Sequence, residues 1–284
     1  MDFKLFEKNK LTLIEKNGKF GLFHVSLENN EVKFSPVEPL TDVSAIFVAE
    51  EAELVFSTKG LYTLEGKKVS DFALTQVELI PLAGKHCYLI VSKVSTSSFD
   101  VLLWNGQKVV WSRKVTDYKT SERFVALQEE DGWEIYRCNG NRVSLAYPIP
   151  KDNKLFLGDS LVVCGGPGNY RMYSLRGRSS LLCSEKNLIV ASPTEPFAIC
   201  AGLSGKKVDS FYHGRWTTFD NVDSFSIVDN DFRLFALSKN GKYFVYNFDG
   251  TPLPLNLENG VDFIASNNGV LLIMNGNDIN FYEK

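Results

Sequence analysis

Three histidines, His24, His86 and His213, are the candidates for general acid–base chemistry, because histidine titrates near neutral pH. They lie far apart in the chain and share no local motif. The Gly-x-Ser-x-Gly turn that presents a nucleophilic serine in many hydrolases does not occur in the sequence. We interpret the histidines as structural or surface residues and predict no catalytic residue. A Ser-His-Asp triad assembled from distant segments stays an alternative.

Cysteine chemistry is the second possibility that the residue types raise. The cysteines are odd in number and none forms a Cys-x-x-Cys pair, the spacing typical of zinc and redox sites. Each lies in an apolar, strand-like stretch, so we interpret them as buried free thiols in a reducing compartment. A zinc or redox site is the alternative, and no metal site is predicted. The five residues are Cys87, Cys138, Cys164, Cys183 and Cys200.

Two short motifs resemble ligand loops. The run Gly165–Gly168 could cradle a phosphate, but phosphate loops lead into a helix, and an alternating, strand-like segment follows here. Asp229-Asn230-Asp231 begins like a calcium loop but lacks the glycine and the distal glutamate of an EF-hand. We interpret both as turns between strands and predict no cofactor.

A cluster of basic and aromatic residues gives the candidate binding site. Arginine and aromatic side chains are common anchors of protein interfaces, and they also stack on sugars or bases. The other interpretation is that strand alternation places the tyrosines between sheets and the arginines in solvent. Lys206 and Lys207 add positive charge one repeat later. The candidate binding residues are Tyr170, Arg171, Tyr173, Arg176, Arg178, Tyr212, His213 and Trp216.

The elements that must position these residues are marked by Asn-Gly pairs. Seven occur, at positions 17–18, 105–106, 139–140, 240–241, 259–260, 268–269 and 275–276. Asn-Gly favours the type I′ turn of a β-hairpin, because both central residues of that turn have positive φ. Short apolar stretches lie between the pairs, and they predict antiparallel strands with no long helix.

The strands recur in units that begin near residues 3, 45, 79, 124, 155, 188, 225 and 263. A repeat of about 40 residues with four strands is typical of a β-propeller blade. We therefore predict one all-β domain, residues 1–284, formed by a β-propeller of four-stranded antiparallel blades. Eight blades are favoured and seven is the alternative. The last unit has three strands, and the N-terminal strand Phe3–Phe6 is expected to complete it and close the ring.

The segment Glu15–Phe23 resembles a WG repeat, a bacterial β-repeat written around Gly-Lys-Trp-Gly-Leu, with Phe20 in place of the tryptophan. The repeat pattern as a whole resembles the β-propeller superfamily. That resemblance implies a docking platform more often than an enzyme. The Trp-Asp dipeptides, Kelch double glycines and sialidase Asp-boxes of particular subfamilies are absent from the sequence, so no functional residues are carried over.

Composition limits the class of partner. The net charge of −3 and the pI near 5.8 argue against nucleic acid, which usually binds a basic face. The longest apolar run, about five residues at 270–274, is far below the ~20 that a membrane span needs. No apolar stretch of signal-peptide length begins the chain, so we expect a soluble, cytoplasmic protein.

Three functions follow from these observations. The favoured one is a non-catalytic scaffold that docks a protein partner on one face of the propeller. The first alternative is a lectin-like propeller that binds glycans through exposed tryptophan and tyrosine. The second is a hydrolase or lyase with its site at the central channel, although the predicted inner strands carry few of the titratable residues that such a site needs.

Overall fold

The computed structural model of the chain describes residues 2–72, 77–84, 86–176, 179–202, 206–253, 259–267 and 269–283. Within these residues the regular elements are 29 strands and two short 3-10 helices, η1 (Glu7–Asn9) and η2 (Glu50–Ala52). The strands form eight antiparallel sheets, in each of which strands adjacent in the sequence pair with each other. The predictions of an all-β fold and of eight blade-like sheets are confirmed.

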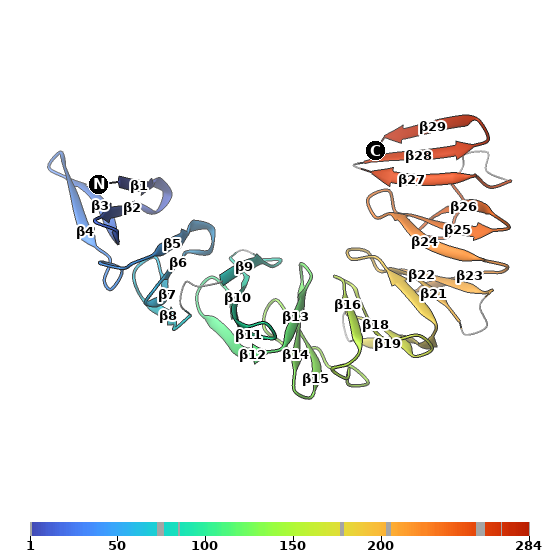
Figure 1. Cartoon of the computed structure of the whole chain (residues 1–284), viewed down its shortest axis with the longest axis horizontal. Helices are drawn as coiled ribbons and strands as arrows, with labels where there is room; N and C mark the ends of the chain where they lie inside the picture. Colours follow the sequence, from blue (N-terminus) through green and yellow to red (C-terminus); the bar gives the residue numbers. More distant parts are fainter. Residues whose placement is uncertain are drawn as a thin grey trace. The chain divides into compact units, whose positions relative to one another are not determined.

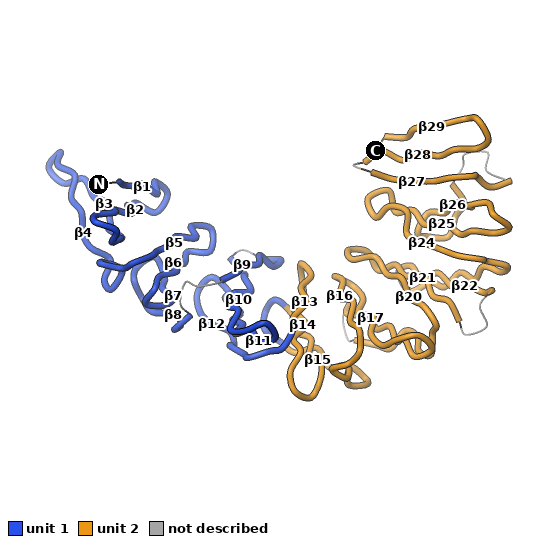
Figure 2. Tube along the Cα trace, in the orientation of Figure 1, with its two compact units in different colours: residues 1–117, 138–141 blue, residues 118–137, 142–284 orange. Residues whose placement is uncertain are grey.

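The chain divides into two compact units, shown in different colours in Figure 2. The first comprises residues 1–117 and 138–141, and the second comprises residues 118–137 and 142–284.

The first unit has three sheets of four strands each (Figure 1). One contains β1 (Asp2–Phe6), β2 (Leu11–Lys16), β3 (Lys19–Glu28) and β4 (Glu31–Pro36). The next contains β5 (Ile46–Ala49), β6 (Leu54–Ser57), β7 (Gly60–Thr63) and β8 (Lys68–Ser70). The third contains β9 (Val77–Pro81), β10 (Tyr88–Ser95), β11 (Ser98–Trp104) and β12 (Val109–Val115).

Five sheets follow, two with four strands and three with three among the described residues. They are β13 (Asp117–Thr120), β14 (Phe124–Glu129) and β15 (Gly132–Arg137); β16 (Lys154–Leu157), β17 (Leu161–Gly165), β18 (Tyr170–Ser174) and β19 (Ser180–Lys186); β20 (Leu188–Ala191), β21 (Phe197–Ala201), β22 (Val208–Tyr212) and β23 (Arg215–Phe219); β24 (Ser224–Asp229), β25 (Leu234–Lys239) and β26 (Lys242–Asn247); and β27 (Phe263–Asn267), β28 (Val270–Asn275) and β29 (Asp278–Glu283).

Not every blade has the four strands that the sequence predicts. The fourth sheet begins with β13, before residue 124. The predicted strand 143–147 does not form, and only the flanking residues Arg142 and Ile149 make isolated bridges to β15. Pro148 and Pro150 flank Ile149 and have no backbone N–H to donate to a ladder. In the second sheet the fourth strand is Lys68–Ser70, and the predicted strand 72–74 lies mostly outside the described residues.

The Asn-Gly pairs form two kinds of turn. At Asn17-Gly18 and Asn240-Gly241 both residues have positive φ, as a type I′ turn requires. His213-Gly214, between β22 and β23, has the same conformation. At the pairs beginning at residues 105, 139, 259 and 275, only the glycine has positive φ. Asn268 lies outside the described residues.

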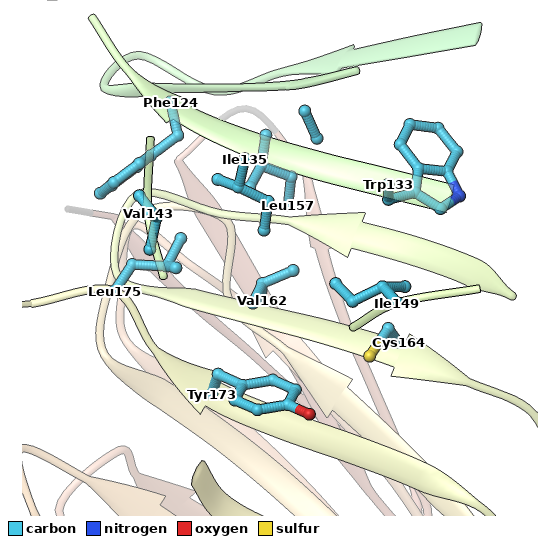
Figure 3. Close-up of a cluster of buried hydrophobic side chains, with 11 residues drawn as sticks. Phe124, Trp133, Ile135, Val143, Ile149, Leu157, Val162, Cys164, Tyr173 and Leu175 are labelled. Carbon is cyan, nitrogen blue, oxygen red and sulfur yellow. The ribbon is translucent and has the colours of Figure 1, made fainter. Parts of the chain in front are cut away.

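Apolar clusters fill the spaces between neighbouring sheets of a unit. In the second unit, Phe124 and Ile135 pack against Val162 and Tyr173 of the following sheet (Figure 3). The second strand of a sheet is buried on both faces, as the five consecutive buried residues of β21 show. The apolar runs Leu188–Ala191 and Phe263–Ala265 instead predict that the first strand of a sheet is the one buried on both faces. This prediction is wrong, because the first strand is the edge strand of its sheet and β20 is partly exposed, whereas β21 pairs with a strand on each side.

Each terminal sheet also has an apolar face that its neighbour in the same unit does not cover. In sheet β1–β4, Leu22 and Phe6 pack toward sheet β5–β8, whereas Phe3 is 77% exposed and Leu27 69% exposed on the opposite face. In sheet β27–β29, Phe281 is 65% exposed. The predicted closure by Phe3–Phe6 stays a prediction; β1 pairs with β2 and is the edge strand of its sheet.

Candidate binding site

The predicted binding residues in sheet β16–β19 face in different directions. Tyr170 packs toward sheet β20–β23, and the guanidinium of Arg171 lies over the ring of Tyr147 in the preceding sheet, 5.0 Å from its centroid. Tyr173 is fully buried in the cluster of Figure 3 and therefore offers no exposed anchor. Arg176 lies beyond the other end of β18 and donates from Nε to the Ser160 Oγ, 3.1 Å away.

The remaining predicted residues are also separated. Tyr212 packs toward the following sheet, against Phe248, whereas Trp216 packs on Phe211 at 5.0 Å on the opposite face of the same sheet. His213 occupies the turn between them, with its Nε2 4.0 Å from a carboxylate oxygen of Glu195. Arg178 lies outside the described residues. The structure therefore does not gather the predicted residues into one surface, because consecutive residues of a strand point to opposite faces.

A pocket lies on the side of sheet β13–β15 where Tyr147 meets Arg171. Its volume is about 410 Å³. We call it the Tyr147 pocket. Roughly 300–1,000 Å³ is the usual range for ligand-binding pockets, so it could hold a small ligand or a few side chains. It is lined by Glu129, Asp131, Gly132, Trp133, Glu134, Ile135, Arg142, Val143, Ser144, Leu145, Tyr147, Pro148 and Ile149.

Gly132 allows the segment 142–149 to lie close to β15 in the wall of this pocket. It begins β15 with φ near 136°, which disfavours any other residue. A Cβ there would lie 2.2 Å from the Ile149 carbonyl oxygen, to which the Trp133 N–H donates at 2.9 Å. The segment 142–149 is thus held directly against β15 without forming a full strand.

The lining combines apolar side chains with a mainly acidic rim. Ile135, Val143 and Ile149 are buried, whereas the lining also carries the carboxylates of Glu129, Asp131 and Glu134 against one guanidinium. That guanidinium, of Arg142, lies 2.7 Å from Glu134. A rim with this charge balance favours a cationic ligand and repels phosphate.

One carboxylate at the pocket is fixed by polar contacts. Glu134 accepts a short hydrogen bond from the Tyr136 hydroxyl in addition to its ion pair with Arg142, so its carboxylate is held between two elements. Tyr147 itself is 50% exposed and presents an aromatic ring at the rim.

Trp133 has a hydrogen-bond donor for which the described part of the chain provides no acceptor. Its side chain is only 8% exposed, and its buried indole N–H has no hydrogen-bond partner among the described residues. Most buried donors have a partner, because leaving one unmatched costs about 1–3 kcal/mol. Neither Trp133 nor Tyr147 was among the predicted residues. Tryptophan at the start of a strand, read alone, indicates only core packing.

A second, smaller pocket of about 300 Å³ lies at the end of sheet β20–β23. Tyr212 and His213 line it together with Arg215 and Asp249. Beside it, the Glu195 carboxylate binds the Arg233 guanidinium at 2.8 Å. Two of the predicted residues therefore do share a concave surface, although Trp216 lies on the other face.

The remaining candidates for chemistry are dispersed. The His86 Nδ1 is 2.7 Å from the Glu51 carbonyl oxygen. His24 lies on β3, far from His86 in the sequence. The motif at 229–231 forms a turn in which the Asp229 carboxylate accepts from the Phe232 N–H at 2.7 Å, and Gly165–Gly168 connects β17 to β18, as interpreted. Among the residues described, no three His, Cys, Asp or Glu side chains gather as a metal site.

Comparison with known proteins gives likenesses in structure only. No protein-family model matches the chain, and no curated protein matches it in sequence. Similar solved structures include Hsv2 of Kluyveromyces lactis, with 10% identity, 95% of this chain and 88% of that chain covered, and a TM-score of 0.35. The Dos1 propeller has 9% identity, coverage of 99% and 90%, and a TM-score of 0.35.

A protein of unknown function from Desulfotomaculum acetoxidans is also similar, with 14% identity, coverage of 84% and 91%, and a TM-score of 0.35. At these identities and TM-scores, neither the fold nor a function of this chain is argued from the likenesses. No helix in the described part of the chain is long and apolar enough to cross a membrane.

Proposed function

We propose that this protein is a non-catalytic binding protein that recognises another protein at the Tyr147 pocket. The observation that carries the proposal is the unmatched, buried indole N–H of Trp133 in the wall of a pocket of about 410 Å³. Because the N–H is itself covered, a bound segment would have to shift the covering side chains before its backbone carbonyl could supply the acceptor that this donor lacks. Tyr147, Trp133 and Arg142 are also the residue types that most often anchor protein interfaces.

The chemistry of the rim defines the partner segment. Three carboxylates and one arginine favour a segment with lysine or arginine, and the apolar side chains of the lining favour a neighbouring aliphatic or aromatic side chain. The same carboxylates would repel nucleic acid. A cytoplasmic, reducing location belongs to the proposal, because the five cysteines are free thiols.

A glycan is the second candidate ligand. The exposed ring of Tyr147 beside carboxylates offers a stacking surface and acceptors for sugar hydroxyls. The two candidates differ in charge dependence. A basic peptide should bind less tightly as salt screens the rim, whereas a neutral sugar should be almost insensitive to salt.

The experiment uses the full chain, a peptide array and a glycan array. We expect binding to peptides that pair an apolar residue with lysine or arginine, and no binding when the basic residues are replaced by glutamate. Tyr147→Ala should weaken binding by about tenfold or more, in the range of an interface anchor. Trp216→Ala is the matched control, because Trp216 is also exposed but lies two sheets away.

Three outcomes would overturn the proposal. Selective glycan binding lost in Tyr147→Ala would assign the pocket to sugars. Peptide binding lost only in Trp216→Ala would move the site to sheet β20–β23. Equal binding of basic and acidic peptides by the wild type and by Tyr147→Ala would show that the pocket makes no specific contact.

A further inference from the structure

Two cysteines from neighbouring sheets meet in the second unit. Cys183 lies on β19 and Cys200 on β21, and their sulfur atoms are 4.0 Å apart. They lie in the apolar cluster between sheets β16–β19 and β20–β23, with Met172 and Phe211 beside them. Because they belong to different repeats, 17 residues apart, the sequence gives no spacing motif for the pair.

The two thiols have different surroundings. Cys200 is fully buried, whereas Cys183 is partly exposed. Either thiol could donate in the contact between the two sulfurs, and when Cys183 is the thiolate the Cys200 S–H is the donor. The Cys183 sulfur also receives the Met172 backbone N–H and lies near the ammonium of Lys186. These contacts lower the pKa of Cys183, and the hydrogen bond and burial raise the pKa of Cys200.

An ion pair holds the Lys186 ammonium near the Cys183 sulfur. The Lys186 Nζ lies 3.1 Å from the Asp209 carboxylate on β22, in a partly buried ion pair. Thr218 donates to the other oxygen of the same carboxylate at 2.8 Å. Asp209 opposes part of the effect of Lys186, because its negative charge raises the pKa of Cys183. The hydrogen bond from Cys200 remains the largest influence on the Cys183 thiolate.

We propose that Cys183 and Cys200 form a peroxide-sensitive dithiol whose oxidation joins the two sheets by a disulfide bond. The Cys183 thiolate attacks one oxygen of hydrogen peroxide, the S–O bond forms and the O–O bond breaks. The departing hydroxide takes a proton and leaves as water. The Cys200 thiol then gives up its proton, and its sulfur attacks the sulfenic sulfur of Cys183 and displaces a second water. Two thiols lose two electrons, and one peroxide gains them.

The approach of the sulfurs needs only a local change. A disulfide bond is about 2.05 Å long, so the sulfurs must come closer by roughly 2 Å. β19 is an edge strand of its sheet, and its pairing with β18 is irregular on both sides of Met172. The half-buried Cys183 can therefore shift more easily than Cys200, which lies on a strand with a neighbour on each side.

Cys164 and Cys87, whose pKa values are raised and not lowered, serve as internal standards. Burial raises the pKa of Cys164 to about 11 and that of Cys87 to about 11. The Cys87 thiol donates to the carbonyl oxygen of Cys138 at 3.2 Å. These thiols fit the interpretation as small buried hydrophobes, and we expect them to react slowly.

The experiment treats the full chain, at low concentration, with hydrogen peroxide for different times and then blocks free thiols. Trypsin cuts after Lys186 and so separates the two cysteines, which lie in peptides 179–186 and 187–206. We expect a reducible linked pair of these peptides, lighter by two hydrogen atoms than their sum. Cys183 should be consumed at least tenfold faster than Cys164 or Cys87.

Single variants separate the two roles. In Cys200→Ala, Cys183 should stop at the sulfenic acid and be trapped by dimedone, whereas in Cys183→Ala, Cys200 should stay reduced. Cys164→Ala is the matched control and should form the link at the wild-type rate. Equal reactivity of Cys183 and Cys164, or oxidation of Cys183 in the wild type without a link to Cys200, would overturn the proposal. Circular dichroism of every variant confirms that it is folded.

Discussion

At the scale of single residues, polar contacts on the surface of the second unit fix loops to strands. The carboxylate of Asp262 is the clearest example. It lies 2.5 Å from the Lys242 ammonium and accepts from the Gly276 backbone N–H at 2.7 Å. One side chain thus connects the start of β26 to the turn between β28 and β29. These contacts lower the pKa of Asp262, the hydrogen bond from the Lys242 ammonium being the largest cause.

This lowered pKa predicts a pH dependence of stability. A carboxyl with a lower pKa in the folded state stabilises the fold above its unfolded pKa of about 4, and loses that effect as pH falls through the folded value. We expect Asp262→Asn to melt at a lower temperature than the wild type at pH 7. The difference should shrink as pH falls from about 4 toward 2. Thermal unfolding followed by circular dichroism across this range measures it.

Asp220→Asn is the control for this prediction. Asp220 forms an exposed ion pair with Lys207 at 3.3 Å and should contribute little to stability. A constant difference between Asp262→Asn and the wild type from pH 7 to pH 2 would contradict the assignment.

At the scale of elements, the pocket exists because segment 142–149 lies against β15 without completing a strand. Trp133 and Tyr136 of β15 each make one bridge to it, at Ile149 and Arg142. The residues between these bridges are free to line the pocket instead of joining a ladder. A regular fourth strand would place alternate residues on the two faces, and fewer of them would line this pocket.

Gly132→Ala tests this close approach. A Cβ at Gly132 would lie 2.2 Å from the Ile149 carbonyl oxygen, which is backbone and cannot rotate away. We expect a loss of more than about 2 kcal/mol in the free energy of unfolding, from the clash together with the unfavourable positive φ. Gly241→Ala, in a turn with positive φ and open space around it, is the matched control and should lose about 1 kcal/mol.

Denaturant titration of both variants gives these free energies. The variant Gly132→Ala should also lose the binding assigned to the Tyr147 pocket, whereas Gly241→Ala should keep it. Equal losses of stability in the two variants would mean that segment 142–149 is not held against β15 in solution.

At the scale of the whole molecule, the apolar faces of the two terminal sheets bear on the predicted closure of the ring of blades. Each has one covered face and one apolar face that is exposed within its own unit. The exposed residues are Phe3, Leu5, Leu27, Val32 and Phe34 in sheet β1–β4, and Phe263, Ile279 and Phe281 in sheet β27–β29. Apolar faces of this kind usually acquire cover in a soluble protein. We keep the single domain with a closed ring as a proposal.

A single domain should unfold in one cooperative transition, and scanning calorimetry of the full chain tests this. If the last sheet is covered in solution, Phe281→Lys should lower the melting temperature by several degrees, since burying a phenylalanine contributes about 1.5–3 kcal/mol. Val94→Lys, at a residue 60% exposed on β10, is the control and should change little. Two transitions, or equal effects of both variants, would contradict the prediction.

The sequence by itself determined most of the strands and their antiparallel order, and it favoured eight sheets over seven. Turn chemistry and apolar runs are local properties, so Asn17-Gly18 and the stretch of β21 could be interpreted without partners. The tertiary structure alone decided which residues meet. Tyr173 became core, the indole of Trp133 entered a pocket wall, and Cys183 met Cys200 across two sheets. Such contacts depend on how one sheet's face is placed on the next, and no spacing along the chain records that placement.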